Sequence, residues 1–440
     1  MNYRECLDKF CIIGAGAAGL AAAKSLKEKG ISFDVIEARP DVGGLWQYGT
    51  NSPVYKNTHL ISPKQVQAFS DFPMPEDYPD FPNHQLVWQY FQAYARHFNL
   101  YEHIQFNILV KNLERVGSAW ELTLSNGETR TYRGVIIAIG YHNQPKYPDF
   151  PGKFTGKILH AKDYNTPAEL SGARVLVVGA GQSAMDIIVD SAINAQKTFH
   201  SIRRGFLCFP KYFLGIPTEL LFHKYFPLLK FLPIQVILKI FARLEQFSLF
   251  LQGVNFQKLR LPPLNFKNTI IPTIGQNIYH YYIHGDVVGK PNIRELREKK
   301  VIFCDGTEEE IDIIVYATGY KVAFPFIRKE LINWSERSAI PELYLHIFHP
   351  RYDNIFVIGL AHPIGTHWVV FESQSKLVAK YIRALENGLT SSQKFNRVKS
   401  NPKRGCVNYS LASSKYQEHA NLIDKMAYLK QINKIERSFF

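Results

Sequence analysis

KFCIIGAGAAGLAAAKSLKEKGISFDVIEA, Lys9 to Ala38, carries the strongest structural signal of the chain. An apolar run of strand type leads into a turn with the spacing Gly14-x-Gly16-x-x-Gly19, and an alanine-rich helix follows. The first glycine permits the tight turn, the second lets backbone N–H groups approach a pyrophosphate, and the third allows close helix–strand packing. A second strand ends at Glu37, where a carboxylate can accept hydrogen bonds from ribose hydroxyls. These residues predict a dinucleotide-binding βαβ unit.

A second unit of the same plan follows in ARVLVVGAGQSAMDIIVDSAINAQKTFHSIRRG, Ala173 to Gly205. Its glycine turn is GAGQSA, Gly179 to Ala184, but no carboxylate ends its second strand. Arg203 and Arg204 stand there instead, and a guanidinium at that place can pair with the 2′-phosphate of NADPH. Two such units predict an α/β fold with parallel sheets, and they imply that a hydride passes from NADPH to a flavin.

The composition narrows the classes of protein and of partner. The chain has 440 residues, 46% of them hydrophobic and 20% charged, so a folded protein of two domains, or of one with a large insertion, is expected. The net charge of +14 suits nucleic acid, an anionic membrane or a phosphate-bearing cofactor, but no zinc-finger spacing or RNA-binding motif supports nucleic acid. The start, MNYRECLDKFCIIGAG, lacks the apolar run of a signal peptide, so the mature chain is expected to begin near Met1.

The five cysteines are scattered and form no Cys-x-x-Cys pair. This argues against a disulfide framework and a structural zinc, so no metal is expected, and it favours a reducing, cytoplasmic compartment. The segment DVGGLWQYGTNSPVY, Asp41 to Tyr55, also lacks cysteine. Disulfide reductases need a redox pair shortly after the first nucleotide unit, so a dithiol mechanism is excluded.

The residues from Phe206 to Phe266 are rich in Phe and Leu, but charges and Pro233 interrupt them. They contain no uncharged run of transmembrane length, which is about 18 residues. Two interpretations remain open for this insert. One is a helical subdomain that caps a substrate cavity, and the other is a peripheral membrane contact or an oligomer face over about 206–256.

The chain resembles the class B flavin-containing monooxygenases over nearly its whole length. The resemblance rests on motifs that occur in the family's order: GAGAAG (Gly14–Gly19), GGLW (Gly43–Trp46), SPKQVQAFSDFPMP (Ser62–Pro75), FTGKILHAKDY (Phe154–Tyr164), GAGQSAMDI (Gly179–Ile187), YATGY (Tyr316–Tyr320) and ESQSK (Glu372–Lys376). It implies a tightly held FAD that NADPH reduces and that reacts with O2 to give a C4a-hydroperoxide, which bound NADP+ shields. It also implies an active site without a side-chain nucleophile or a carboxylate pair.

The resemblance further implies which residues contact the cofactors. The positions that match the FAD side are Gly14, Gly16, Gly19, Glu37, Gly44 and Trp46. Those that match the NADPH side are Gly179, Gly181, Gln182, Ser183, Arg203 and Arg204. Ala317, Thr318 and Gly319 resemble the crossing that returns the chain from the NADPH unit to the flavin. For Trp46 a packed core aromatic is the alternative interpretation.

One position departs from the family. Members that oxidise amines and sulfides usually carry Asn three residues before the lysine that is here Lys64, and this sequence has Ile61 there. Because an isoleucine side chain donates no hydrogen bond, N- or S-oxygenation and Baeyer–Villiger or keto-acid oxygenation both stay open. His59 or Asn57 can supply polarity instead. An uncoupled NADPH oxidase and a non-catalytic dinucleotide-binding protein are further alternatives.

The fingerprint FTGKILHAKDY ends in Tyr164, whereas Baeyer–Villiger relatives usually have Trp at that place. Its His160 stands just before the second unit, so a role in coupling the two domains is favoured over proton chemistry. We expect an FAD unit made of residues 1–168 and 325–440, the latter with a C-terminal helix, and an NADPH unit over 169–324 that contains the helical insert at about 206–266. The expected reaction is monooxygenation of a small, fairly apolar molecule with NADPH and O2, and a homo-oligomer is one option for the assembly.

Overall fold

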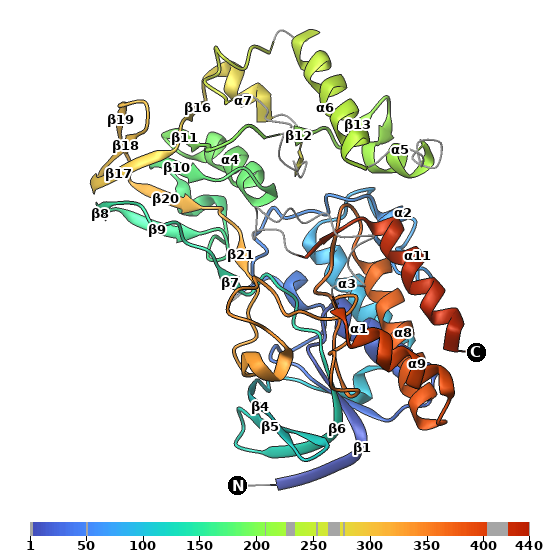
Figure 1. Cartoon of the computed structure of the whole chain (residues 1–440). Helices are drawn as coiled ribbons and strands as arrows, with labels where there is room; N and C mark the ends of the chain where they lie inside the picture. The colour runs from blue at the N-terminus through green and yellow to red at the C-terminus, as the bar shows by residue number, and fades with distance from the viewer. Residues whose placement is uncertain are drawn as a thin grey trace.

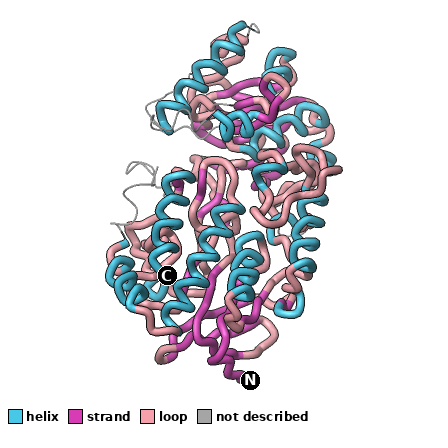
Figure 2. Tube along the Cα trace, turned by 90° about the vertical axis from the view of Figure 1, so that its right-hand side faces the viewer, coloured by secondary structure: helices cyan, strands magenta, loops and turns pink. Residues whose placement is uncertain are grey.

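The computed structural model of the chain describes residues 3–49, 52–206, 208–225, 234–251, 254–262, 273–275, 278–402 and 421–439. These residues form two bodies, one above the other in Figure 1, and both chain ends belong to the lower body. Figure 2, turned by 90°, shows strands inside the lower body and helices around them. The lower body contains the first glycine loop and is called the first unit, and the upper body contains the second loop and is called the second unit.

A seven-stranded sheet forms the centre of the first unit, with the order β3-β2-β1-β6-β5-β4 and with β22 paired to β6. The pairs β1–β2, β1–β6, β2–β3 and β6–β22 are parallel, whereas β4 and β5 run antiparallel. The strand β22 comes from the far end of the chain, so that end completes a sheet that the first residues begin. The strands are β1 (Tyr3–Ile13), β2 (Phe33–Ile36), β3 (Ile104–Gln105), β4 (Val110–Val116), β5 (Ala119–Leu124), β6 (Thr129–Ile137) and β22 (Ile355–Val357).

Helices cover this sheet and bring distant parts of the chain together. The helix α1 (Ala17–Glu28) follows the first glycine loop and packs against α8 (Trp368–Glu386). The small alanine side chains of α1 are good helix formers and allow this close packing. The helix α3 (His84–His97) is capped by Asn83, which accepts a hydrogen bond from the N–H of Leu86 at 3.0 Å. The ring of Phe91 on α3 lies 4.6 Å from that of Trp368, so α3 and α8 share one core.

The second unit has a five-stranded parallel sheet with the order β16-β11-β10-β20-β9. The helix α4 (Gln182–Asn194) follows its glycine loop, as in the first unit. A four-stranded sheet with the order β19-β18-β17-β8 lies beside it. The strands are β8 (Gly152–Phe154), β9 (Lys157–His160), β10 (Arg174–Val178), β11 (Lys197–Ser201), β16 (Val287–Lys290), β17 (Ile293–Glu298), β18 (Lys300–Phe303), β19 (Glu308–Glu310) and β20 (Ile313–Tyr316). One mainly parallel sheet and one fully parallel sheet, each packed with helices, confirm the α/β fold.

The crossing between the units lies earlier than the sequence indicated. The strands β8 and β9 precede residue 168, yet β8 pairs with β17 and β9 with β20, which are strands of the second unit. A boundary at residue 168 does not agree with this pairing, and we propose that the second unit begins near Gly152. The short strands β7 (Gln144–Pro145) and β21 (Tyr320–Lys321) pair antiparallel and form a two-stranded ribbon between the two bodies (Figure 1).

The Phe- and Leu-rich insert expected at about 206–266 is described in part, because residues 207, 226–233, 252–253 and 263–266 lie outside the described residues. Its first part is not helical. The strand β12 (Cys208–Phe209) pairs with β15 (Thr273–Ile274), and β13 (Tyr212–Phe213) forms a hairpin with β14 (Ile216–Pro217). The helices α5 (Thr218–Tyr225) and α6 (Ile234–Leu251) follow, and α7 (Ile278–His284) leads back to the sheet. No helix among the described residues is long and apolar enough to span a membrane.

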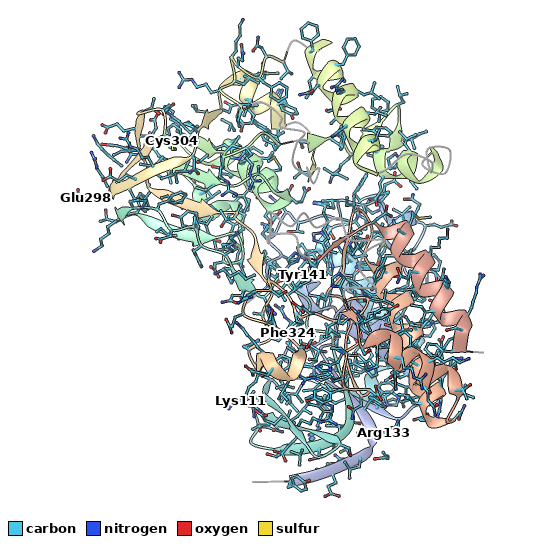
Figure 3. The ribbon with its side chains drawn as sticks, in the orientation of Figure 1. Lys111, Arg133, Tyr141, Glu298, Cys304 and Phe324 are labelled. Carbon is cyan, nitrogen blue, oxygen red and sulfur yellow. The ribbon has the colours of Figure 1, made fainter. Side chains whose placement is uncertain are left out.

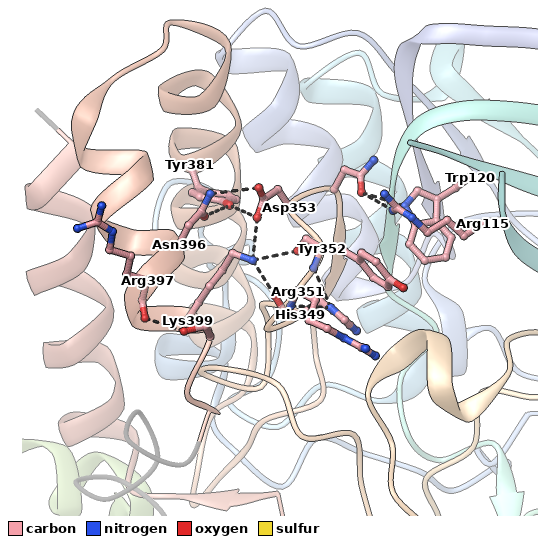
Figure 4. Close-up of polar contacts among 12 residues, drawn as sticks. Arg115, Trp120, His349, Arg351, Tyr352, Asp353, Tyr381, Asn396, Arg397 and Lys399 are labelled. Atoms are coloured by element: carbon pink, nitrogen blue, oxygen red, sulfur yellow. Dashed lines mark hydrogen bonds and ion pairs between the residues drawn. The ribbon is translucent and has the colours of Figure 1, made fainter. Parts of the chain in front are cut away.

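The C-terminal part adds α9 (Thr390–Lys399) and α11 (Lys425–Glu436), with residues 403–420, including Cys406, outside the described range. One buried lysine anchors α9 to the first unit (Figure 4). The side chain of Lys399 is 1% exposed, and its Nζ donates to the carbonyls of His349 and Tyr352 at 2.8 and 3.1 Å. The same Nζ lies 2.8 Å from a carboxylate oxygen of Asp353. Asn396 of α9 also donates to Asp353, at 3.1 Å, so two residues of α9 hold one loop.

Candidate active site

The first glycine loop lies at the carboxyl ends of β1 and β6. Gly14 has a φ of +103°, and a Cβ on it would lie 2.7 Å from the carbonyl oxygen of Ala138. A Cβ on Gly19 would lie 1.9 Å from the carbonyl oxygen of Gly14. No other residue fits at these two positions without movement of the backbone. The loop therefore brings the start of α1 as close to the sheet as a pyrophosphate site requires.

Glu37 and the segment Gly44 to Trp46 flank this loop. The buried carboxylate of Glu37 accepts hydrogen bonds from the N–H groups of Ala15 at 2.6 Å and Arg39 at 2.8 Å. Burial raises its pKa, and the backbone donors counteract this. Gly44 lies against Gly16, since a Cβ on Gly44 would be 2.9 Å from the Cα of Gly16.

Trp46 is half-buried and packs against the largest core cluster of the first unit. Its side chain is thus partly a core contact, which agrees with the alternative interpretation for this residue. Gly16, Glu37 and Gly44 nevertheless surround the beginning of α1 as an FAD site requires.

The second glycine loop repeats the geometry of the first. Gly179 has a φ of +125°, and a Cβ on it would lie 2.4 Å from the carbonyl oxygen of Ala317. A Cβ on Gly181 would meet no atom within 4 Å, so Gly181 leaves open space beside the first turn of α4. The Nε2 of His200 donates a hydrogen bond to the carbonyl of Gly179 at 2.5 Å and so supports the loop. This open space at a helix N-terminus suits a phosphate group.

The other residues predicted for the NADPH side fall into two groups. Arg203 and Arg204 are exposed and follow β11, the second strand of the motif β10–α4–β11, as the sequence predicted. Ser183 is half-buried in the first turn of α4. The side-chain amide of Gln182 pairs with the backbone of Ile274. Its NH2 group donates to the carbonyl of Ile274 at 2.8 Å, and its oxygen accepts from the N–H of Ile274 at 3.0 Å. Gln182 thus connects α4 to β15.

Ala317, Thr318 and Gly319 stand between β20 and the ribbon strand β21. The hydroxyl of Thr318 donates to the carbonyl of Lys146 at 2.5 Å, and the N–H of Lys146 donates to the carbonyl of Gly319 at 3.0 Å. Ala317 is buried against the glycine loop. Thr318 therefore holds the two strands of the crossing together.

His160 is completely buried at the same crossing. Its Nδ1 accepts from the N–H of Lys162 at 3.1 Å, which requires the proton on Nε2, and Nε2 lies 3.1 Å from the carbonyl of Gly319. Burial lowers the pKa of the ring. Both ring nitrogens are thus engaged with backbone groups, and neither can take up a proton from a substrate.

Ile61 lies on the loop that leads into the short helix α2 (Lys64–Gln67), and Lys64 is the first residue of this helix. The side chain of Ile61 is exposed, at 36%. The ammonium group of Lys64 donates to the carbonyls of Pro75, Glu76 and Tyr78 at 3.1, 2.6 and 2.5 Å. Lys64 therefore shapes the loop after α2. The amide of Asn57 donates to Asp190 at 2.8 Å, and His59 Nδ1 contacts the carbonyl of Asn57.

A set of aromatic and imidazole rings that the sequence did not single out lies where the units meet. Tyr141 follows β6 and lies between the two bodies in Figure 3. Its hydroxyl is 3.4 Å from Nε2 of His367, which precedes α8, and the ring of His142 is 5.1 Å from that of Tyr320. Desolvation lowers the pKa of His367 to about 3. This imidazole is thus neutral at physiological pH.

A buried carboxylate from the insert reaches the first unit. Glu219 of α5 is 8% exposed, and a Cβ on Gly365 would lie 2.7 Å from its Oε1. Lys425 of α11 donates to the hydroxyl of Thr366 at 2.9 Å in the same place. Burial raises the pKa of Glu219 and lowers that of Lys425. The absence of a side chain at Gly365 provides the room for this contact, which no local sequence signal indicates.

A cavity of about 650 Å³ lies beside these elements. The loop around α2, the first turn of α8 and one face of α11 line it, and it is partly open. Its lining is mainly apolar, with polar groups on the α2 loop and at the start of α11, and includes Lys64, Phe69, Met74, Thr366, Val369 and Leu429. The volume and the lining suit a small, fairly apolar molecule.

The model of a protein family described as flavin-binding monooxygenase-like matches residues 7–437 of the chain. The chain belongs to this family. It is therefore an FAD-containing, NADPH-dependent flavin monooxygenase. The match confirms the resemblance that the motifs indicated, and with it both expected cofactors.

Curated relatives agree with the family match. This flavin monooxygenase is 32% identical to the N-oxide-forming dimethylaniline monooxygenase 2 of Oryctolagus cuniculus over 400 residues, which are 86% of this chain and 74% of that protein. It is 28% identical to flavin-containing monooxygenase 5 of Rattus norvegicus over 439 residues, or 95% and 81% of the two chains.

Solved structures share the fold. The S-allyl-L-cysteine S-oxygenase of Allium sativum superposes with a TM-score of 0.67 at 19% identity, over 98% of this chain and 88% of that one. Cyclohexanone monooxygenase with bound cyclohexanone gives a TM-score of 0.70 at 16% identity, over 100% and 97% of the two chains. At these identities the two structures support the two-unit architecture of this flavin monooxygenase and do not distinguish its substrate.

Proposed function

We propose that this flavin monooxygenase uses NADPH and O2 to oxygenate nitrogen or sulfur in a small, fairly apolar molecule. The observation that carries the proposal is the pair of glycine loops, each closed against the carbonyl at the end of a strand of its own sheet, with the ribbon β7–β21 between the units. The relatives whose names state their reactions form an N-oxide or oxygenate sulfur. Membership of the same family favours the same class of reaction here.

The cofactor sites follow from the two loops. We propose that Gly14, Gly16, Gly19, Glu37 and Gly44 hold FAD, with Trp46 packed at its edge. NADPH would occupy the open space at Gly181 and the helix start at Ser183, with Arg203 and Arg204 near its 2′-phosphate. Gln182 and Thr318 are engaged with protein backbone and would position the loops, not the cofactors. When bound, the flavin supplies the oxygen activation.

We propose that the 650 Å³ cavity beside α2 and α8 admits the substrate. Its apolar wall of Phe69, Met74 and Leu429 would bind the carbon skeleton, and exclusion of water by this wall would protect the reaction from hydrolysis. Val369→Trp fills part of the cavity. The variant should raise the KM for the substrate at least tenfold and leave the KM for NADPH unchanged. If the variant and the wild type have equal KM values for the substrate, the cavity is not the substrate site.

The function is tested with three substrates side by side. Purified FAD-containing protein is mixed with NADPH, O2 and either N,N-dimethylaniline, S-allyl-L-cysteine or cyclohexanone, and the products are identified by mass spectrometry. We expect an N-oxide or a sulfoxide in proportion to the NADPH consumed. NADPH consumption matched by hydrogen peroxide in all three reactions would show an oxidase and contradict the proposal.

Baeyer–Villiger oxygenation is a second candidate because Ile61 replaces the usual asparagine and offers no hydrogen bond at the exposed loop. In that case cyclohexanone alone should yield a product, a lactone with one added oxygen. The variant Ile61→Asn restores the amide and should then shift product formation from the ketone toward the amine and the sulfide. An unchanged product ratio would show that this position does not select the reaction.

We also propose that the protein resides in a reducing, cytoplasmic compartment. There α6 would make a peripheral contact with an anionic membrane. Large apolar side chains recur every three or four residues along one face of α6, and their exposures are Val236 38%, Ile240 44%, Leu244 57%, Phe247 60% and Phe250 72%. The cations Lys239 and Arg243 are exposed beside this stripe. An apolar stripe with adjacent positive charge is the pattern of a helix that lies in a membrane interface.

Sedimentation with liposomes tests this contact. The protein should bind vesicles that contain phosphatidylserine, and salt should weaken the binding. Leu244→Glu combined with Phe247→Glu should abolish it, whereas Tyr3→Glu on the exposed start of β1 serves as a control. If the double variant instead changes the sedimentation coefficient without vesicles, the stripe is an oligomer interface.

A further inference from the structure

Two aspartates on one face of α4 lie at the junction of the two units. Asp186 and Asp190 are one helical turn apart, and Asp190 is 6% exposed. Neither belongs to the glycine loop that precedes α4, and neither has a role in the function described above. Burial raises the pKa of both carboxyl groups. A carboxylate in such a place needs several hydrogen-bond donors.

Within α4, the amide of Gln182 donates to Asp186 at 3.2 Å, and the other donors come from outside the helix. The hydroxyl of Tyr55 donates to Asp186 at 2.5 Å. The amide of Asn57 donates to one oxygen of Asp190 at 2.8 Å, and the hydroxyl of Tyr164 donates to the other at 2.9 Å. We call the two aspartates and these three outside donors the Asp186–Asp190 seam. Tyr55 and Asn57 belong to the first unit, so α4 of the second unit is held by side chains of the first.

A backbone hydrogen bond supports the seam. The N–H of Lys56, between the two donors of the first unit, donates to the carbonyl of Asn165 at 2.8 Å. The rings of Tyr55 and Tyr164 lie 5.6 Å apart, so the two phenols also contact each other. Hydrogen bonds to a carboxylate are about twice as strong as neutral ones, and removal of one donor leaves a buried acceptor unpaired. The seam therefore fixes one relative position of α4 and residues 55–58.

The seam is one of several attachments between the units. Another is the ribbon β7–β21, with His160 and Thr318 hydrogen-bonded beside it. The insert also contacts the first unit, through Tyr212, which donates to Asp80 at 2.8 Å, and through Glu219. A ribbon of two short strands permits rotation of one body against the other, and attachments at other places restrict this rotation; of these, the seam holds α4 directly. Because α4 begins directly after Gly181, a shift of α4 moves the glycine loop with it.

We propose that the Asp186–Asp190 seam positions the second unit so that NADPH approaches the flavin for hydride transfer. This inference goes beyond the choice of substrate and rests only on the NADPH- and FAD-dependent activity of the family. Tyr55, Asn57 and Tyr164 are thus positioning residues that act through α4. Hydride transfer is sensitive to such placement, since a displacement of about 1 Å can lower a rate by about a hundredfold.

Anaerobic stopped-flow measurements of flavin reduction by NADPH test the proposal on the FAD-loaded protein. We compare Asn57→Ala and Tyr164→Phe, each of which removes one donor to Asp190, with Tyr147→Phe. Tyr147 is exposed, and its hydroxyl is 3.5 Å from Asp163, so it is a matched control near the same crossing. The limiting reduction rate should fall about tenfold to a hundredfold in the two seam variants. The Kd for NADPH, the FAD content and reduction by dithionite should stay as in the wild type.

Several outcomes would overturn the proposal. The first is a limiting reduction rate within about twofold of the wild type in both variants. The second is a loss of rate that is accompanied by a loss of bound FAD or of thermal stability. Tyr164→Phe removes only the hydroxyl oxygen and keeps the ring, so this variant can still be measured if Asn57→Ala fails to fold. Tyr164→His, which keeps an N–H donor, should recover part of the rate. A wild-type flavin that NADPH does not reduce would instead contradict the enzyme's assigned activity.

Discussion

Gly179 and Gly181 stand two positions apart in one loop and have different physical roles. Gly179 is required by the protein itself, because its φ is +125° and its Cβ would meet the carbonyl of Ala317. Gly181 faces open space, and its backbone has an ordinary extended conformation. A glycine that the protein does not need for its own packing marks the place where a ligand comes close.

Gly181→Ala should therefore weaken NADPH binding without an effect on the fold. The added methyl group enters the space of the pyrophosphate, and we expect the KM for NADPH to rise about tenfold, which corresponds to about 1.4 kcal/mol. Thermal unfolding should be unchanged. Gly179→Ala is the comparison, since it should lower the unfolding temperature. An unchanged KM in Gly181→Ala would place the phosphates elsewhere.

Single residues were predictable from the sequence where a local pattern carries their role. The glycine loops and Glu37 belong to such a pattern, and the structure places them together at the ends of parallel strands. Asp186 and Asp190 gave a weaker signal, as the two charged residues, four apart, of the helix α4. Glu219 gave none, because its partners Thr366 and Lys425 are more than a hundred residues away and only the tertiary fold brings them close.

Among the elements, α9 is attached in part by one buried charged residue. Lys399 is buried, and its ammonium group satisfies two carbonyls and Asp353 (Figure 4). Lys399→Met keeps the length of the side chain but leaves these acceptors unpaired. We expect the free energy of unfolding to fall by about 1–3 kcal/mol in urea denaturation. Lys394→Met, on the exposed face of α9, should change it by less than about 0.5 kcal/mol.

The elements around the glycine loops were predicted correctly, whereas the crossing between the units was not. The proline-rich residues before β8 gave no strand signal, and β9 pairs with β20, which lies about 150 residues further along. Strand partners at such a separation are set by the topology of the sheet and not by the local pattern. For the same reason β12, whose partner β15 lies far along the chain, escaped prediction. The strands β13 and β14 form a local hairpin, but with two residues each they are too short to show an alternating pattern.

For the whole molecule, buried histidines predict acid sensitivity. Burial lowers the pKa of His200 and His346 to about 4 and that of His349 to about 3. The unfolded value is about 6.5, so below it the unfolded chain binds more protons than the folded one at these sites. Their contribution to stability is therefore complete above about pH 6.5 and decreases as the pH falls toward 4.

His349→Asn should reduce this acid sensitivity. The asparagine oxygen can still accept hydrogen bonds from the N–H groups of Arg351 and Tyr352, as Nδ1 of His349 does at 3.1 and 2.9 Å, and it takes up no proton. In thermal melts between pH 7 and pH 5, the unfolding temperature of the variant should fall less than that of the wild type. His97→Asn, at an exposed position, should follow the wild type. Parallel curves for all three proteins would contradict the prediction.

The position of β22 has a consequence for the synthesis of the chain. Its partner strand β6 ends at Ile137, but β22 begins only at Ile355, so the central sheet stays incomplete until most of the polypeptide has left the ribosome. At about 5–20 residues per second this interval lasts roughly 10–40 seconds, during which the contiguous second unit can fold by itself. The nascent first unit has an open strand edge in that time, and chaperones that recognise such edges are the expected early partners.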